Sequence, residues 1–291
     1  MDLIDNILNF VESVRDKINA LTTAINSKQA ALVSGTNIKT VNSQSLLGAG
    51  DLVISGGSSE PDGTEFFLLP TGIGSAVSAL GLSYSVVGTL TAPSYSLTNK
   101  YRSLKRVDYL VTTPATNAVA SVRNTSTMFF RKGAVGCGFR FKATFGISTG
   151  ASNASKRIFA GMRSLTSAAT DVDPSTITNM IGFGKDLSDA NLQLMHNASG
   201  TVTKIDLGSN FYVSTSDKTG FFTIEIKSID SSGFEYYVKN EENGFTASGS
   251  VTTNIPADSQ YLTPHICASV SGISSVIGLS IFNIKGKIFF E

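Results

Sequence analysis

The sequence predicts a mainly β protein, in which a short N-terminal parallel coiled coil precedes a C-terminal jelly-roll-like β-sandwich. Two observations lead to this prediction: a heptad repeat of branched apolar residues near the N-terminus, and about a dozen short segments of alternating polarity beyond residue 106. We expect four regions: a trimeric coiled coil at residues 1–30, a short interchain β module at 31–57, a linker with an irregular β segment at 58–105, and a β-sandwich head domain at 106–291.

The predicted N-terminal helix has a single apolar seam. Its seven apolar residues are spaced alternately by three and four positions: Ile4, Ile7, Val11, Val14, Ile18, Leu21 and Ile25. This heptad pattern holds one face of a helix against partner helices, and Ile at both core positions favours three strands over two. We therefore expect these residues to form a homotrimer. The alternative is a single amphipathic helix that packs on its own domain.

Two short segments of strand-like sequence follow the helix. Residues 38–42 alternate in polarity, residues 48–51 are typical of a turn, and residues 52–54 begin another strand. Strands this short bury a face only in combination with other copies, so we expect an interchain module. A Gly- and Ser-rich spacer at 56–63 marks its end. Beyond it, residues 65–105 are either an intertwined β segment or the first strands of the sandwich.

The strand pattern is clearest at residues 136–148. One face would hold Phe139, Phe141, Ala143, Phe145 and Ile147, and the other Arg140, Lys142 and Thr144. The same alternation at 222–227 and 234–239, with a turn at 231–233, predicts a hairpin. Further strands are predicted at 110–112, 128–131, 157–163, 180–183, 192–196, 202–207, 245–251, 265–270 and 277–290. This succession of short strands is typical of a sandwich.

Composition excludes several classes of protein. The formal net charge is only +1, so a general nucleic-acid binder is not expected. No apolar run is long enough to span a bilayer, and Asp2 and Asp5 stand where a secretory signal needs basic residues. We expect a soluble chain without membrane insertion. Cys137 and Cys267 lie far apart in apolar runs, which indicates unpaired core thiols.

Several of these segments resemble fibre proteins of tailed bacteriophages. Residues 35–55 (GTNIKTVNSQSLLGAGDLVIS) are similar to a module that lies between the stalk and globular parts of phage appendages. The C-terminal stretch is similar to phage fibre domains at residues 139–148, 157–164, 171–184 and 191–211. The resemblance implies a trimeric virion protein with β-sandwich heads, attached to capsid, neck or baseplate proteins. The helix is shorter than the stalks of many fibres, so either a tail fibre or a stubby head fibre fits.

The sequence contains two histidines, His196 and His265, which are the candidates for a catalytic base. A Ser hydrolase needs one of them as a base, but the sequence has no GxSxG elbow. Neither histidine has a partner at a zinc-ligand spacing. We therefore interpret both as surface or hydrogen-bonded residues, and we expect no catalytic, cofactor or metal site.

Carboxylate pairs are the strongest competing candidates, because some phage appendages cleave polysaccharide with two Asp or Glu residues. The pairs are Asp171 with Asp173, Asp186 with Asp189, and Glu225 with Glu235. The structural interpretation of the first pair is a loop in which Asp side chains bond to nearby backbone. For the last pair it is cross-strand pairing with Lys227 and Lys239. Calcium at either Asp pair remains an alternative, although the DxDxDG loop is absent.

The function favoured by the sequence is attachment of a virion to a host-surface glycan or other receptor. Candidate sugar contacts are Tyr212, Tyr236, Tyr237 and Tyr261, although each fits packing as well. Asn124, Asn153 and Asn197 match the N-glycosylation pattern, but a sequence rich in Ser and Thr produces such matches by chance. The alternatives are a purely structural head or neck decoration fibre and a polysaccharide depolymerase.

Overall fold

The computed structural model describes residues 2–30, 63–68, 76–79, 82–125, 129–130, 138–150, 156–214, 218–228 and 232–289. The chain divides into two compact units, Met1–Ser59 and Glu60–Glu291. The predicted interchain module at 31–57 lies outside the described residues.

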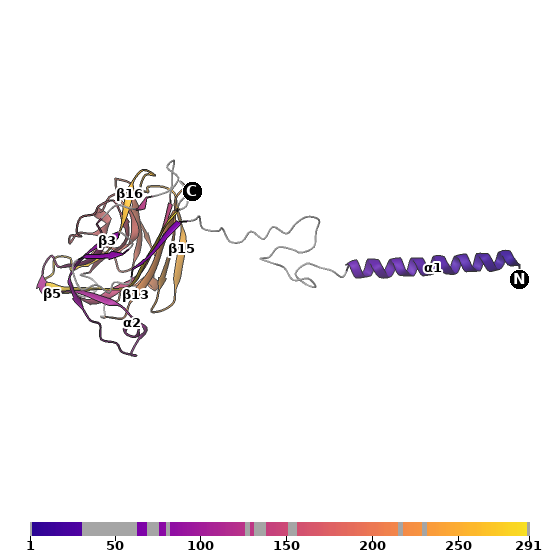
Figure 1. Cartoon of the computed structure of the whole chain (residues 1–291), viewed down its shortest axis with the longest axis horizontal. Helices are drawn as coiled ribbons and strands as arrows, with labels where there is room; N and C mark the ends of the chain where they lie inside the picture. Colours follow the sequence, from indigo (N-terminus) through magenta and orange to yellow (C-terminus); the bar gives the residue numbers. More distant parts are fainter. Residues whose placement is uncertain are drawn as a thin grey trace. The chain divides into compact units, whose positions relative to one another are not determined.

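The first unit contains helix α1 (Leu3–Ala30), which confirms the predicted helix (Figure 1). Asp5 lies in its first turn, where a negative charge stabilises the positive end of the helix dipole. The side chains of residues 2–27 are all exposed. Among the residues that the structure describes, no helix has the length and apolar character of a membrane span.

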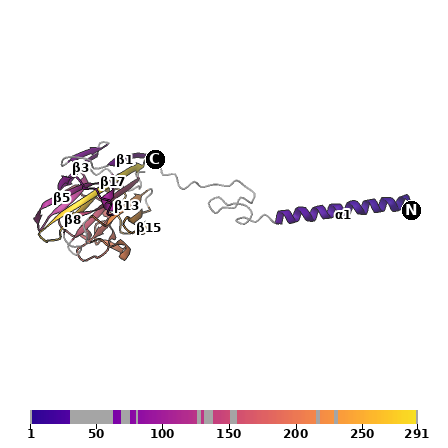
Figure 2. The same cartoon turned by 90° about the horizontal axis from the view of Figure 1, so that it is seen from below.

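The second unit is a β-sandwich of two antiparallel sheets, as the alternating segments predict. One sheet has eight strands, with order β15 (Thr246–Val251), β14 (Phe234–Asn240), β13 (Phe221–Ser228), β8 (Gly138–Gly150), β17 (Ser275–Phe289), β5 (Val107–Ala115) and β4 (Thr89–Thr91), while β1 (Gly63–Leu68) also pairs with β17. Figure 2 shows several of these strands, including β5, β17, β8 and β13. The predicted hairpin is confirmed, because β13 and β14 are antiparallel partners.

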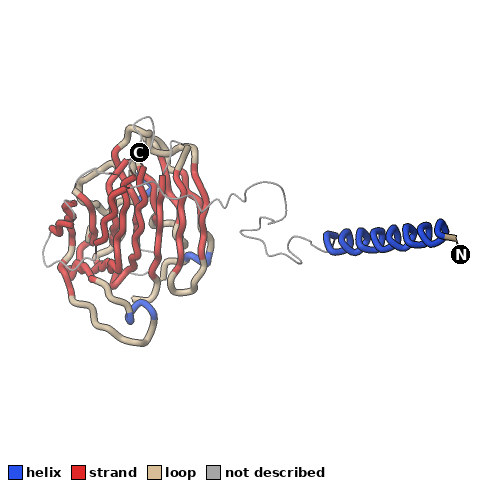
Figure 3. Tube along the Cα trace, turned by 45° about the vertical axis from the view of Figure 1, so that its right-hand side comes forward, coloured by secondary structure: helices blue, strands red, loops and turns tan. Residues whose placement is uncertain are grey.

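The other sheet has nine strands. Their order is β12 (Thr203–Asp206), β11 (Gln193–Asn197), β10 (Met180–Lys185), β9 (Arg157–Arg163), β16 (Tyr261–Ser269), β6 (Val119–Asn124), β3 (Leu82–Val87) and β2 (Ala76–Ala79), and β7 (Phe129–Phe130) also pairs with β16. The helices that the structure describes in this unit are short: α2 (Lys100–Ser103), η2 (Pro174–Thr176) and η3 (Ser209–Phe211). In Figure 3 the strands make up most of this unit, and the short helices lie in its connections.

The main core lies between the two sheets. Its members include the whole predicted apolar face of β8: Phe139, Phe141, Ala143, Phe145 and Ile147. The nine-stranded sheet contributes Val122, Met162 and Ile266 from three neighbouring strands. Each strand thus places alternate residues in the core and directs the residues between them away from it.

Strands from residues 58–105 belong to the sandwich. β1 pairs with the second half of β17, β4 pairs with β5, and β3 pairs with β6. The sandwich therefore includes strands N-terminal to residue 106, which is the second of the two alternatives for this segment. Its strands span only three to six residues each, so their alternation is too brief to identify them individually in the sequence.

Candidate functional site

The seven seam residues of α1 form an exposed apolar stripe. Their exposed fractions range from 39% at Val14 to 62% at Ile4 and Leu21. Leu3, Leu8 and Phe10 are also exposed, and each is adjacent in sequence to a seam residue. The apolar face is consequently wider over the first three turns than the heptad pattern alone indicates.

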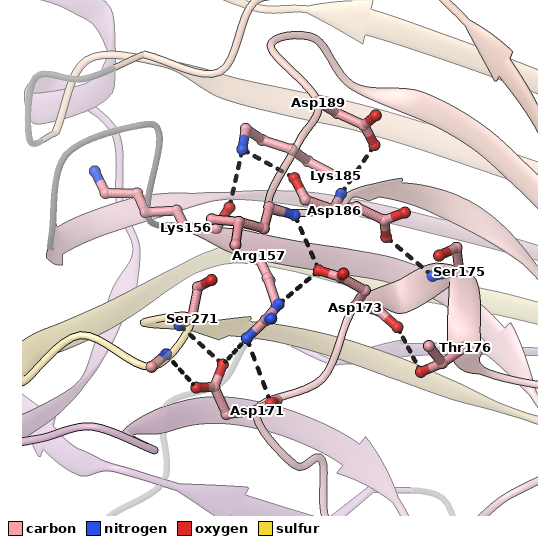
Figure 4. Close-up of polar contacts among 12 residues, drawn as sticks. Lys156, Arg157, Asp171, Asp173, Ser175, Thr176, Lys185, Asp186, Asp189 and Ser271 are labelled. Carbon is pink, nitrogen blue, oxygen red and sulfur yellow. Dashed lines mark hydrogen bonds and ion pairs between the residues drawn. The ribbon is translucent and has the colours of Figure 1, made fainter.

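The first carboxylate pair surrounds one arginine on the sandwich (Figure 4). Arg157, the first residue of β9, donates from Nη1 to Asp171 Oδ1 at 2.8 Å and from Nε to Asp173 Oδ1 at 2.6 Å. Backbone N–H groups of Ser271 and Gly272 donate to the two oxygens of Asp171 at 2.9 and 2.8 Å. The two carboxylates therefore fasten the β9–β10 loop to β9 and to the β16–β17 turn.

The second carboxylate pair shares one lysine. Lys204 Nζ lies 2.9 Å from Asp186 Oδ2 and 2.6 Å from Asp189 Oδ2. Asp186 Oδ1 also accepts from the backbone N–H of Ser175 at 3.0 Å, which ties the pair to η2. Lys185 is fully buried, and its Nζ donates to backbone carbonyls instead (Figure 4).

The surroundings of the first pair favour the ionised form of both carboxyl groups. Burial raises the pKa of Asp171, but hydrogen bonds, led by that from Ser269, bring its pKa below the ordinary value. Burial likewise raises the pKa of Asp173. The hydrogen bonds from the Leu187 N–H and from Arg157 outweigh burial, so the pKa of Asp173 lies below its ordinary value. A glycosidase needs one carboxylic acid of raised pKa, so these two carboxylates are suited to binding cations and N–H groups rather than to general-acid catalysis.

The third pair, Glu225 and Glu235, lies on the outer face of the eight-stranded sheet. Glu235 contacts Lys227 at 3.7 Å, as the sequence predicts. Glu225 instead contacts Lys142 of β8 at 3.2 Å, which corrects its predicted pairing with Lys227 or Lys239. The reason is the register: Lys142 lies directly opposite Glu225 in the β8–β13 ladder.

The histidines lie at different places in the nine-stranded sheet. His196 is buried, and its Nδ1 lies 3.0 Å from the backbone carbonyl oxygen of Asn254, which confirms the hydrogen-bonded interpretation. His265 is fully buried, so it is not a surface residue. Within the described residues, no group of three His, Cys, Asp or Glu side chains is placed to hold a metal ion.

Cys267 packs beside a small second core on the outer face of the same sheet. That core consists of Phe159, Met180 and Met195. Burial raises the pKa of the Cys267 thiol to about 11, and the thiol is free in the structure. Cys137 and the predicted acceptor Asn153 lie outside the described residues.

The two other asparagines that match the N-glycosylation pattern, Asn124 and Asn197, are not accessible to a glycan. Asn124 and Asn197 are each fully buried. Asn197 Nδ2 donates to the carbonyl oxygens of Ile177 and Gly200, both at 3.0 Å. Their sequence pattern therefore marks strand ends rather than modification sites.

Two of the four candidate tyrosines are exposed. Tyr236 packs against the main core and Tyr237 is half-buried, whereas Tyr212 and Tyr261 are 44% and 54% exposed. Tyr212 is bridged to Asn191, whose Nδ2 donates to Asp206 Oδ1 at 3.2 Å. Asn191 therefore lies opposite the exposed Tyr212 on the neighbouring segment, and its amide holds Asp206.

Tyr212 lies in a cluster of connections at one end of the sandwich. The backbone carbonyl of Asn210, two residues before it, accepts from Asn240 Nδ2 at 2.8 Å and from Asn243 Nδ2 at 2.9 Å. Phe245, which follows in the same connection, is 51% exposed. We name Tyr212, Asn243 and Phe245 the aromatic end.

Sequence reasoning did not single out the cations. Arg157 and Lys204 organise the carboxylate pairs, and Arg123 and Arg163 contact the β9–β10 loop from the outer face of the nine-stranded sheet. In the sequence, the three arginines lie at outward-facing positions of mostly apolar strands, whereas Lys204 lies on the polar strand β12. Such a charge is buried only when a loop covers that face, and the sequence does not show the cover.

No protein-family model and no curated protein matches the sequence. Among solved structures, the fold is similar to peanut lectin, at 12% identity over 78% of this chain and 97% of that chain, with a TM-score of 0.47. It is similar to an endo-1,3-beta-glucanase from Streptomyces sioyaensis, at 10% identity over 80% and 98%, with a TM-score of 0.46. It is also similar to a carbohydrate esterase from Shiga toxin-encoding bacteriophage phi24B, at 12% identity over 71% of this chain and 90% of that chain, with a TM-score of 0.38. With TM-scores below 0.5, these likenesses carry no argument about function.

Proposed function

We propose that this chain is a homotrimeric appendage of a phage particle, in which three α1 helices form a parallel coiled coil and three sandwich heads attach to a host-surface glycan. The chain would reside in the virion, docked on capsid, neck or baseplate proteins. The head would bind without catalysis. This proposal combines the sequence resemblance to phage fibres with the geometry of the helix and of the head.

The observation that carries the proposal is the uncovered seam of α1. Seven apolar side chains are exposed on one stripe of a helix that belongs to a compact unit separate from the sandwich. Full burial of a Val, Leu or Ile side chain contributes about 1.5–3 kcal/mol. Three chains that bury their seams together thus gain enough to hold a trimer, and Ile at both core positions selects three strands.

The head supplies the binding surface. The aromatic end combines two exposed rings, Tyr212 and Phe245, with the amide of Asn243. Stacking of a sugar on a single aromatic face gives weak binding, and three heads on one stalk raise the avidity by about 10²-fold when the receptor spacing fits.

The test is glycan binding by the full-length chain on an array of host-surface polysaccharides. We expect retention by the intact protein, loss in the Tyr212→Ala variant, and no change in the Tyr261→Ala variant, which removes a similarly exposed ring elsewhere. A seam variant, Ile7→Asp with Val14→Asp, should weaken binding by about 10²-fold while it keeps the same selectivity.

Two outcomes would replace the proposal. A head that retains no cell-surface material supports a purely structural decoration fibre. New reducing ends after incubation with host capsule would indicate a polysaccharide depolymerase, and the proposal of a non-catalytic head would then be wrong.

A further inference from the structure

A group of three basic side chains lies on the outer face of the nine-stranded sheet, away from the main core. In the ladders, His265 of β16 lies directly opposite Arg123 of β6, and Arg163 of β9 lies opposite Thr263, two residues before His265. Because directly opposed residues of antiparallel strands share a face, the three side chains lie on the same side of the sheet.

His265 and Arg163 are buried and Arg123 is half-buried, and each has polar atoms without a partner among the residues that the structure describes. His265 is fully buried, and neither of its ring nitrogens has a hydrogen bond. Arg163 is 5% exposed, and its buried Nε has no acceptor. Arg123 is half-buried, and its buried Nη1 has none either. Buried donors without acceptors are costly, so these unused N–H groups favour an arrangement in which an acceptor reaches them.

The two arginines are held in place by the loop above them. Arg123 Nε donates to the carbonyl oxygen of Thr166 at 2.9 Å, and Arg163 Nη2 donates to that of Ser167 at 2.6 Å. These contacts fix both guanidinium groups and leave further N–H groups unused. The pair is therefore pre-oriented, which lowers the entropy cost of binding a ligand.

No described carboxylate compensates the two charges. Arg106, Arg140 and Arg157 each contact an Asp or Glu, whereas neither Arg123 nor Arg163 forms an ion pair with a described residue. Burial lowers the pKa of both arginines, and for Arg163 the nearby Arg123 charge lowers the pKa further.

The other titratable groups that face this cluster supply no negative charge. Burial lowers the pKa of His265 well below 6.5, so its imidazole is neutral, and the Cys267 thiol stays protonated because burial raises its pKa to about 11. Two partly buried guanidinium charges thus lie together without a counter-charge, which is strongly unfavourable.

We infer that Arg123, Arg163 and His265 form a binding site for one oxyanion of the carboxylate or sulfate class. Guanidinium N–H groups match the oxygens of such anions, and the neutral imidazole adds a third N–H donor. The half-buried Arg123 gives the side of approach.

Two sources can supply this chemistry: a free inorganic oxyanion, or the acidic group of a uronic acid or sulfated sugar. The experiment is isothermal titration calorimetry of the full-length chain with sodium sulfate, with sodium acetate and with methyl glucuronide. We expect saturable binding at one site per chain. Methyl glucuronide that binds more tightly than acetate assigns the site to acidic sugars, and equal affinities assign it to free anions.

The variants Arg123→Gln and Arg163→Gln should weaken binding by at least 10-fold. Arg123→Gln is the decisive one, because this half-buried residue is the less demanding for folding, and thermal unfolding checks that the variant remains folded. Arg140→Gln, which removes an arginine from the opposite sheet, should bind like the original chain. An absence of saturable heat with all three probes, or an unchanged affinity in folded Arg123→Gln, would overturn the inference.

Discussion

The helix and the sandwich place their apolar residues in opposite ways. In the sandwich, the large apolar side chains of β8 and its neighbours are buried between two sheets of the same chain. In α1, every apolar side chain of residues 3–25 that the structure describes is exposed. The sandwich therefore has a complete core within one chain, whereas the helix does not.

This difference separates two sources of stability. The sandwich should unfold with a free energy that does not depend on protein concentration, because its core is intramolecular. The helix, at 28 residues, owes its stability to packing of an apolar face, so its order should depend on concentration through association. Changes in one unit should accordingly leave the other unaffected.

The largest effect is expected from charges in the seam. Ile7→Asp combined with Val14→Asp removes two apolar side chains per chain that the proposed trimer would bury, a loss on the order of 10 kcal/mol for a trimer. We expect the mass by light scattering to fall from three chains to one, while the thermal midpoint of the sandwich stays the same. The control Asn6→Asp with Ser13→Asp introduces equal charge one position away, and it should remain trimeric. A trimer in both variants would contradict the role of the seam.

The second effect concerns the core of the sandwich. Phe141→Ala deletes a fully buried ring, which should lower the free energy of unfolding by about 3–5 kcal/mol in urea titrations. The oligomeric mass should not change, since the trimer is held by the helix. Lys142→Ala, the adjacent outward-facing position, should cost less than about 1 kcal/mol. Loss of the trimer in Phe141→Ala would show that the two units are not independent.

The third effect is pH-dependent and lies in the β9–β10 loop. Arg157→Gln leaves Asp171 and Asp173 without their cation, and it should cost about 2–3 kcal/mol at pH 7. Both carboxylates have a pKa below their ordinary value of 3.8, so their stabilisation is present above that pH and is lost as the pH falls through the lowered pKa. The difference between variant and original should therefore shrink at pH 3. A pH-independent difference would contradict the ion-pair account, and the exposed Arg15→Gln serves as control.

The smallest effect is expected at Glu241. Lys100, Lys239 and Thr223 hydrogen-bond to its carboxylate and outweigh burial, so its pKa falls to about 2. Its stabilisation is present above pH 4.5 and is lost as the pH falls toward 2. Glu241→Gln should cost about 1–2 kcal/mol at pH 7 and only a small fraction of that at pH 2, as measured by chemical unfolding at both values. An equal cost at both values would be inconsistent with this pKa.

Local sequence pattern predicts those parts of the fold in which neighbours along the chain determine the structure. The alternation at Phe139 to Ile147 identifies both a strand and its buried face, because side chains of a strand alternate between faces. The heptad residues likewise predict the extent of α1. The strands before residue 106 are predicted only as one of two alternatives, because each spans three to six residues and its alternation is too brief to stand out.

The candidate sites depend on pairing between distant segments, which a single sequence does not contain. The sequence identifies Asp171 and Asp173 as loop carboxylates. Their partner Arg157, however, lies fourteen and sixteen residues earlier, at the start of β9. Arg123 and His265 meet only because β6 and β16 pair in one register. Their burial depends on a covering loop, so the sequence alone gave no reason to connect them.

The central claim is that α1 completes its core with two other copies of the chain. Sedimentation equilibrium of the full-length protein in dilute buffer measures this directly. The account predicts a mass three times the 30.6 kDa of one chain, and a lower mass for a chain without residues 1–29. A mass near 30.6 kDa for the full-length protein would contradict it.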